Sequence, residues 1–129
     1  MPSPIPSPGQ SGQSFLGIHG TALALREQRL QLLAGNIANA DTPGFKAQDL
    51  DFQGALRAAL QPVGPGDAID NAATAAQFAP TPRQPSMDGN TVDGERARAQ
   101  FAQATLEYRA SLSFVESKVR GMMTAITGQ

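Results

Sequence analysis

Apolar residues recur at helical spacing near the C-terminus of the chain, in alternating steps of four and three. This is the a/d pattern of a coiled-coil helix, and only Thr105 interrupts it with a polar side chain. Asp93 is suited to cap the helix, and Glu95 in the first turn complements the helix dipole. The pattern therefore predicts one long helix, whose apolar series is Phe101, Tyr108, Leu112, Val115, Val119, Met122 and Ile126.

A second helix is predicted over residues 14–39, with Ser14 as its N-cap. It carries two apolar series with a period of seven residues, which point in different directions and indicate more than one neighbour. The first series is Leu16, Leu23, Leu30 and Ile37, and the second is Ile18, Leu25 and Leu32. We call the first series, together with the apolar series near the C-terminus, the assembly seam.

The remaining segments have a weaker pattern. Residues 1–13 alternate proline with small residues and predict a disordered tail, whereas residues 49–60 predict one short amphipathic helix. Residues 61–90 are rich in proline, glycine and alanine and predict a flexible connector, with a short helical turn near residues 72–77. No window alternates well enough to predict a strand. Residues 14–129 then form one structural domain, with the C-terminal helix in residues 91–129.

The predicted fold class is mainly α, without a sizeable sheet. The long N- and C-terminal helices pair as an α-helical coiled-coil hairpin around a flexible Pro/Gly/Ala-rich middle. Pairing covers one apolar stripe on each helix and leaves the other apolar faces exposed, so we expect the chain to assemble with others. The chain has 129 residues, many of its apolar residues are alanine and tryptophan is absent, which limits the core it builds alone.

Charge and composition exclude several classes of function. The net charge of −1 gives no basic field for nucleic acid, and the absence of cysteine excludes disulfides, thiolate metal sites and cysteine nucleophiles. The N-terminal residues lack the basic and apolar regions of a Sec signal peptide. No stretch reaches the roughly 20 apolar residues that span a bilayer. We therefore expect neither nucleic-acid binding nor a membrane span.

No combination of residues indicates catalysis. The single histidine, His19, has no accompanying ligand motif, and we expect it to be exposed or partly packed on its helix. The close pair Asp49 and Asp51 is expected to be solvated charge beside apolar contacts. Asp88 and Asn90 do not follow the order of a calcium loop and instead predict a turn before the helix cap. The sequence predicts no enzyme, no cofactor or metal, and no small-molecule substrate.

Residues 35–46, GNIANADTPGFK, end the first helix. Proline sets φ at one position and glycine supplies a positive φ at the next, so the segment predicts a type II turn. Two interpretations of the asparagines remain open. They are either ordinary polar residues at a helix end, or they pin the loop to a neighbouring subunit. We call this segment the signature loop: Asn36, Asn39, Asp41, Thr42, Pro43, Gly44 and Phe45.

The run LAGNIANADTPGFKAQDLDF resembles the N-terminal signature of the bacterial flagellar rod and hook proteins, the axial family. The later segment MDGNTVDGERARAQFAQATLEYRASLSFVESKVRGMMTAI resembles the proximal rod members of that family, and DGNTVD favours these over their rod relatives. The resemblance covers about residues 14–58 and 86–127. It implies a structural subunit of the rod, the drive shaft that crosses the periplasm inside the basal body.

The resemblance also implies how such a subunit reaches its place. Axial proteins pair their terminal helices as a coiled coil, stack helically, and leave the cytoplasm unfolded through the flagellar type III export apparatus without a cleaved signal. The implied partners are copies of the chain, other rod proteins, the basal ring and rod-base adaptor, and the export apparatus. Phe15 and Ile18 are either a short export signal or simply helix-packing residues. The alternative function is a cytoplasmic coiled-coil adaptor or export chaperone of the flagellar system, which the heptads alone would permit.

Overall fold

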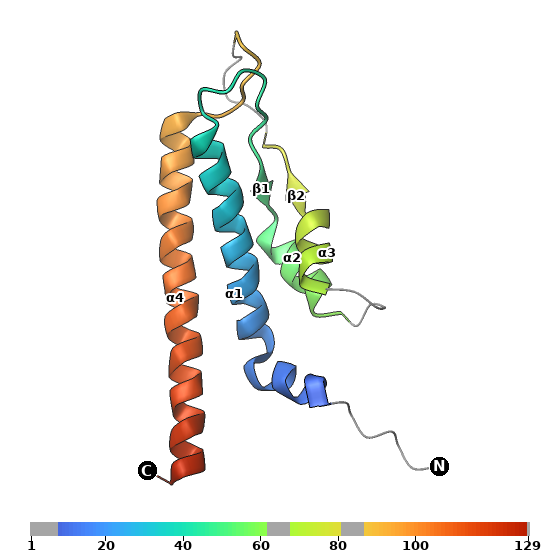
Figure 1. The fold of residues 1–129 in the computed structure, drawn as a ribbon, viewed down its shortest axis with the longest axis vertical. Helices are drawn as coiled ribbons and strands as arrows, with labels where there is room; N and C mark the ends of the chain where they lie inside the picture. Colours follow the sequence, from blue (N-terminus) through green and yellow to red (C-terminus); the bar gives the residue numbers. More distant parts are fainter. Residues whose placement is uncertain (1–7, 62–67, 81–86, 129) are drawn as a thin grey trace, which may run out of the picture.

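The structure, a computed structural model, describes residues 8–61, 68–80 and 87–128, with the side chains of residues 8–15 and 68 left out of that description. The described part is mainly helical (Figure 1). Its elements, in chain order, are α1 (Pro8–Ala38), β1 (Asp49–Leu50), α2 (Phe52–Ala59), α3 (Ala68–Ala75), β2 (Gln77–Phe78) and α4 (Gly94–Thr127). None of the helices in these ranges combines the length and hydropathy needed to cross a bilayer.

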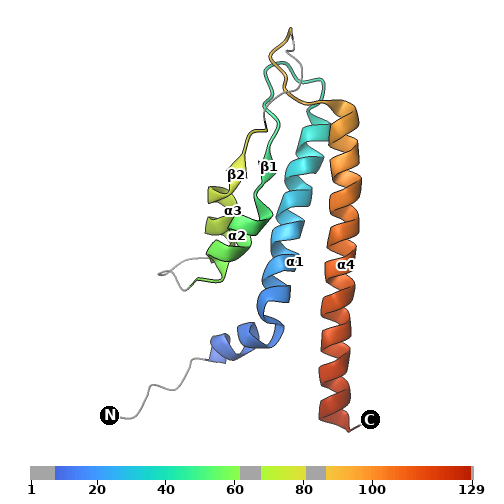
Figure 2. The same ribbon diagram turned by 180° about the vertical axis from the view of Figure 1, so that it is seen from behind.

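The two long helices, α1 and α4, lie side by side and run in opposite directions (Figure 1). The short helices α2 and α3 and the two-stranded sheet form a smaller layer beside α1, away from α4 (Figure 2). The strands are antiparallel, with Asp49 opposite Phe78 and Leu50 opposite Gln77. The helical class and the absence of a sizeable sheet agree with the sequence, although the pattern did not predict these two short strands.

The hydrophobic core lies between α1 and this smaller layer. Leu25, Leu50, Ala55 and Ala73 are buried together, with a second ring of partly buried residues: Leu32, Phe52, Leu56, Ala59, Ile69 and Ala76. The second apolar series of α1 thus supplies Leu25 and Leu32 to the core, whereas Ile18 remains 47% exposed. The prediction that this helix has more than one neighbour is confirmed, because α1 contacts both α4 and the α2–α3 layer.

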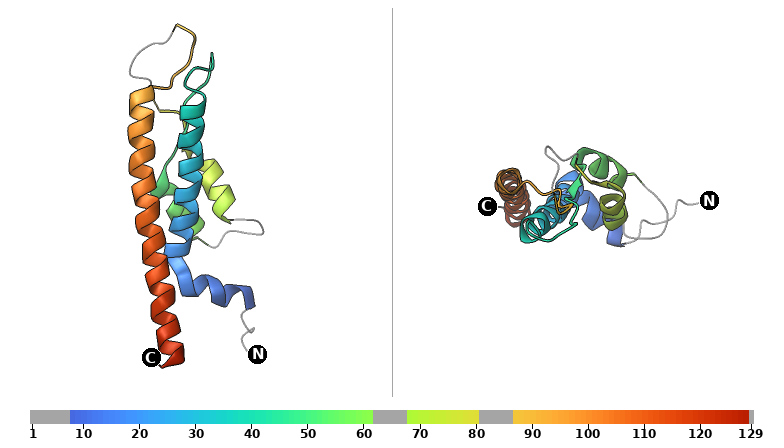
Figure 3. Two further views of the ribbon diagram at one scale, coloured as in Figure 1. Left: turned by 60° about the vertical axis from the view of Figure 1, so that its left-hand side comes forward. Right: turned by 90° about the horizontal axis from the view of Figure 1, so that it is seen from above.

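The helix α1 begins at Pro8 rather than at Ser14, so residues 8–13 of the predicted disordered tail are helical, and residues 1–7 lie outside the described residues. The helix is also bent. Gly17 has φ 51° and ψ −134°, which is not a helical conformation, and the part before it turns away from α4 (Figure 3). A positive φ is readily adopted only by glycine, so the bend occurs at the residue best able to accommodate it.

Aspartates cap two of the helices. The carboxylate of Asp93 accepts a hydrogen bond from the Arg96 N–H at 3.3 Å, with Glu95 in the first turn of α4, as predicted. The carboxylate of Asp51 accepts from the Gly54 N–H at 3.2 Å and begins α2. The short amphipathic helix predicted for residues 49–60 is therefore confirmed, with a cap that the sequence analysis did not assign.

The middle segment is more structured than a flexible connector. It contains α3, which includes most of the predicted turn near residues 72–77, and also the strand β2. Ala72 and Ala73 are buried, and the Asp51 N–H donates to the Ala76 carbonyl at 3.0 Å. Small alanine side chains pack closely here, and Ile69 is the one large apolar residue that α3 adds to the core. The other parts of the predicted connector, residues 62–67 and 81–86, lie outside the described residues.

Candidate functional site

Two segments far apart in sequence meet at one end of the hairpin, above the start of α4 and the end of α1 (Figure 1). Asn90, which is 6% exposed, lies between them. Its side-chain amide donates to the carbonyls of Asn39, Ala40 and Thr42 at 2.9, 2.9 and 2.8 Å. Its side-chain oxygen accepts from the Val92 N–H at 2.7 Å. One side chain therefore holds the end of α1 against the segment that leads into α4.

Main-chain hydrogen bonds extend this contact. The Gly44 N–H donates to the Asp88 carbonyl at 2.8 Å, and the Thr91 N–H donates to the Phe45 carbonyl at 3.0 Å. The Ala47 N–H donates to the Thr91 hydroxyl at 2.8 Å. We call residues 39–47 and 87–92 together the loop junction. The two motifs that carry the family resemblance, the signature loop and DGNTVD, thus bind each other within one chain.

The turns in the loop junction follow the sequence prediction. Gly44 has φ 77°, and the Phe45 N–H donates to the Thr42 carbonyl at 3.2 Å, as a type II turn requires. The Asn90 N–H donates to the Asp88 carboxylate at 3.0 Å, which confirms the turn predicted before the helix cap. Asp41, Thr42, Pro43 and Gly44 are exposed at the tip, and Phe45 is half-buried.

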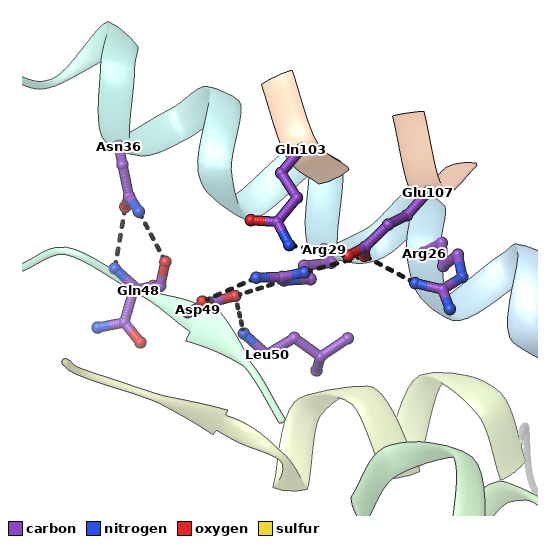
Figure 4. A network of polar contacts seen from close by, with 8 residues as sticks. All are labelled: Arg26, Arg29, Asn36, Gln48, Asp49, Leu50, Gln103 and Glu107. Carbon is purple, nitrogen blue, oxygen red and sulfur yellow. Dashed lines mark hydrogen bonds and ion pairs between the residues drawn. The ribbon is translucent and has the colours of Figure 1, made fainter. Parts of the chain in front are cut away.

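The signature asparagines bind their own chain. Asn36 is 4% exposed; its amide donates to the Gln48 carbonyl at 2.7 Å, and its oxygen accepts from the Gln48 N–H at 2.9 Å (Figure 4). The amide of Asn39 donates to the Gly35 carbonyl at 2.9 Å, and its oxygen accepts from the Thr42 hydroxyl at 3.1 Å. Both side chains therefore fix the register of their own chain, and a contact of Asn39 with a neighbouring subunit stays a prediction.

An ionic network lies deeper along the hairpin and joins α1, α4 and β1 (Figure 4). Arg29 contacts Asp49 at 3.0 Å and Glu107 at 3.3 Å, and Arg26 contacts Glu107 at 2.8 Å. The hydrogen bond to Asp49 raises the pKa of Arg29 against the opposing effect of burial. Arg26 also stacks on the Phe52 ring, with its guanidinium carbon 4.1 Å from the ring centroid. The network thus fixes the angle between the helix pair and the smaller layer.

The network corrects the prediction that Asp49 is solvated, whereas Asp51 is exposed, as predicted. Asp49 is only 7% exposed, is paired with Arg29 and accepts the Leu50 N–H at 2.6 Å, while Asp51 caps α2. The sequence analysis did not identify Arg26, Arg29 or Glu107. A usable signal was present, because two arginines three residues apart share one face of the helix.

The assembly seam flanks the line along which α1 and α4 touch. His19 stacks on Phe114 with ring centroids 4.4 Å apart, and Arg26 and Arg29 reach Glu107. Seam residues come one position after residues that make this contact, as Tyr108 follows Glu107. Each seam side chain therefore points about 100° around its helix from the contact. The helices are antiparallel, so the 100° rotations have opposite senses when both helices are viewed from one end. The seam residues of α1 and those of α4 therefore lie on the same side of the helix pair.

The exposure of the seam residues changes along its length. Most of the seam is half-buried: Leu16, Leu23, Leu30 and Ile37 on α1, and Phe101, Tyr108, Leu112, Val115 and Val119 on α4. Met122 is 39% exposed and Ile126 is 79% exposed. The buried residues of α4 are instead two alanines, Ala97 and Ala104. The side chain of Phe15 lies outside the described residues, so of the candidate export signal only Ile18 is placed.

Comparisons with known proteins identify relatives over most of the chain. A family model for the flagella basal body rod protein matches residues 16–46, which include the whole signature loop. Flagellar basal body rod protein FlgB of Aeromonas hydrophila is 42% identical over 122 residues, which cover 88% of this chain and 92% of the relative. FlgB of Escherichia coli (strain K12) is 43% identical, over 81% of this chain and 87% of that protein.

A third relative gives the same result. FlgB of Cereibacter sphaeroides (strain ATCC 17029 / ATH 2.4.9) is 40% identical over 130 residues, which cover 88% of this chain and 94% of that protein. These alignments extend well beyond the family-model match, to most of the length of both chains. With the fold and the loop junction described above, they establish that this chain belongs to the FlgB family of flagellar basal body rod proteins.

Proposed function

We propose that this structural subunit of the flagellar basal body rod polymerises through its terminal helices, with the assembly seam as the contact between subunits. Membership of the rod protein family gives the structural role and assembly with other rod components. The proposal that the seam is the contact between subunits rests on the position of the seam. Both halves of it flank the α1–α4 contact on one side of the hairpin, where the described part of the chain leaves Met122 and Ile126 open.

Packing supports the seam as a subunit contact. Leu25 lies two positions after Leu23, about 200° further around α1, so the seam points away from the core and the α2–α3 layer. Full burial of a large apolar side chain contributes about 1.5–3 kcal/mol. Covering Met122, Ile126 and the exposed parts of the half-buried seam residues therefore provides a driving force for association. In the assembled rod, the terminal helices act as a coiled-coil hairpin and the subunits form the drive shaft for flagellum-dependent motility.

The small core supports export in an unfolded state. Leu25 and Leu33 are the largest fully buried side chains among the described residues, so the monomer is held by few large contacts. A marginal monomer unfolds readily for the flagellar type III apparatus, and binding to neighbours then stabilises the folded form. We place the subunit in the periplasmic rod, delivered without a cleaved signal peptide, with Phe15 and Ile18 as a candidate export signal.

The proposed partners are copies of the chain, other rod proteins, the basal ring and rod-base adaptor, and the export apparatus. The chain acts by packing, so the proposal includes no enzymatic activity, cofactor, nucleic acid or small-molecule substrate. It also treats residues 14–129 as one structural domain that becomes rigid on assembly. The alternative, a cytoplasmic adaptor or export chaperone of the flagellar system, is not favoured by the FlgB relatives.

Val119→Asp tests the seam. The variant places a charge within the proposed contact, and its matched control is Ser117→Asp, at an exposed position about 160° away on the same helix. In a motile strain that lacks its own copy of the gene, we expect Val119→Asp to abolish swimming and Ser117→Asp to preserve it. Immunoblots of purified basal bodies check incorporation. Normal swimming with Val119→Asp, or its normal level in basal bodies, would contradict the seam.

A further inference from the structure

The C-terminal part of α4 extends past the bend in α1 (Figures 1 and 3). Contacts between the helices continue as far as His19 and Phe114. Beyond Phe114 all residues of α4 except Val115 and Val119 are exposed, including Met122, Met123 and Ile126 at 39, 59 and 79%. This uncovered stretch continues the surface of α4 that contacts α1. The segment that precedes the bend in α1 is therefore the one placed to cover it.

We infer that α4 from Val115 to Ala125 is a docking surface for the chain's own residues 8–16, which reach it when the bend at Gly17 straightens. The register of the two helices supports this. His19 is seven residues before Arg26, and Phe114 is seven residues after Glu107, so both known contacts share one antiparallel register. A further seven residues place Gly12 opposite Gly121 on the same faces.

The lengths of the helices agree with this register. A straight α1 would begin at Pro8, opposite Ala125, and α4 ends at Thr127, so the two helices would finish together. Residues 8–16 span about 14 Å as a helix, and in this register they lie opposite residues 117–125, a stretch of equal length on α4. Gly121 and Ala125 are small and let the two backbones approach closely. Met122, beside them, would lose exposed apolar surface on docking.

Gly17 is the joint between the two arrangements. Helical residues lie on both sides of it, and it alone within α1 has a non-helical conformation. A Cβ at this position would meet nothing within 4 Å, but φ of 51° disfavours any residue other than glycine. Gly17→Ala therefore disfavours the bent arrangement for conformational reasons and leaves the straight helix accessible. Only the dihedral angles of this residue need to change for residues 8–16 to swing.

A disulfide cross-link measures the docking. The chain has no cysteine, so Gly12→Cys with Gly121→Cys introduces a single pair. The matched control pairs Gly12→Cys with Met123→Cys, an exposed position about 160° around α4 from Gly121. In the Gly17→Ala background, at micromolar concentration and under mild oxidation, we expect most chains to form an intramolecular disulfide. This gives a faster monomer band on a non-reducing gel. The control should react at least ten-fold more slowly.

Three outcomes would overturn the inference. The first is a predominance of disulfide-linked dimers, which would show that a second copy covers this surface. The second is equal reaction of the test and control pairs, which would indicate random encounters. The third is the absence of a cross-link in the Gly17→Ala background while circular dichroism shows an intact fold. The reaction is followed in dilute single chains, so such a failure would leave the proposed polymerisation intact.

Discussion

The two ends of the hairpin are built in opposite ways. At the loop junction, three carbonyls converge on the buried amide of Asn90, and hydrogen bonds fix the course of both loops. At the other end, α4 continues beyond Phe114 with large apolar residues in solvent, such as Met123 and Ile126. The first end contains directional bonds that specify one arrangement within the chain. The second contains apolar surface that is left uncovered in the isolated chain.

The difference separates folding from assembly along the molecule. Hydrogen bonds between buried groups stabilise only one geometry, since each misplaced donor or acceptor is left unsatisfied. Apolar contact is non-directional and tolerates a change of partner. In a subunit that folds before it packs against neighbours, buried hydrogen bonds are suited to the place where its own loops meet. Apolar contact is suited to a surface that neighbours cover later. Substitutions at the two ends should therefore have opposite consequences for the isolated chain and for the rod.

Asn90→Ala should have the largest effect on the isolated chain. The substitution removes the amide from three carbonyls and leaves the Ala40 carbonyl and the Val92 N–H without their partner. We expect the free energy of unfolding to fall by about 2–3 kcal/mol. Urea unfolding followed by circular dichroism measures the change. Asn71→Ala, at an exposed position of α3, is the control and should shift stability by no more than about 0.5 kcal/mol. Equal effects of the two would refute a special role for the junction.

Glu107→Gln should have an intermediate effect. The carboxylate contacts Arg26 and Arg29 with its side chain 33% exposed, so solvent screens part of the attraction. Replacing it with a neutral amide of similar shape should lower stability by about 1 kcal/mol. The control is Glu116→Gln, an exposed position on the same helix. Raising the salt concentration should reduce the difference between the two variants, and a difference independent of salt would argue against an ionic origin.

The sequence predicted the elements whose signals are local. Heptad spacing located α4, and Asp93 located its start. Proline followed by glycine located the turn that ends the signature loop. These features depend on residues within one or two helical turns, so a pattern in the chain is sufficient to find them.

The sequence did not predict the features that depend on residues far apart. Asn90 and the carbonyls it binds are about 50 positions apart, and Arg29 and Glu107 are 78 apart. No periodicity connects such pairs. The pattern predicted that the two long helices pair, but it did not show that the seam residues only flank the contact. Small residues such as Ala97 and Ala104 are the buried ones on α4, and they give a weak hydrophobic signal. For the same reason α3, which is rich in alanine, was included in the predicted flexible connector.

Ile126→Ser should have the smallest effect on the isolated chain and a clear one on the rod. The side chain is 79% exposed, so its removal should change the free energy of unfolding by less than about 0.5 kcal/mol. If the seam packs against neighbours, the same change removes apolar contact from every subunit interface and should slow swimming in soft agar. Ile126→Val keeps most of that apolar surface and should restore motility. Unimpaired swimming with serine would remove Ile126 from the seam, whereas a large loss of monomer stability would show that this end of α4 is already packed within one chain.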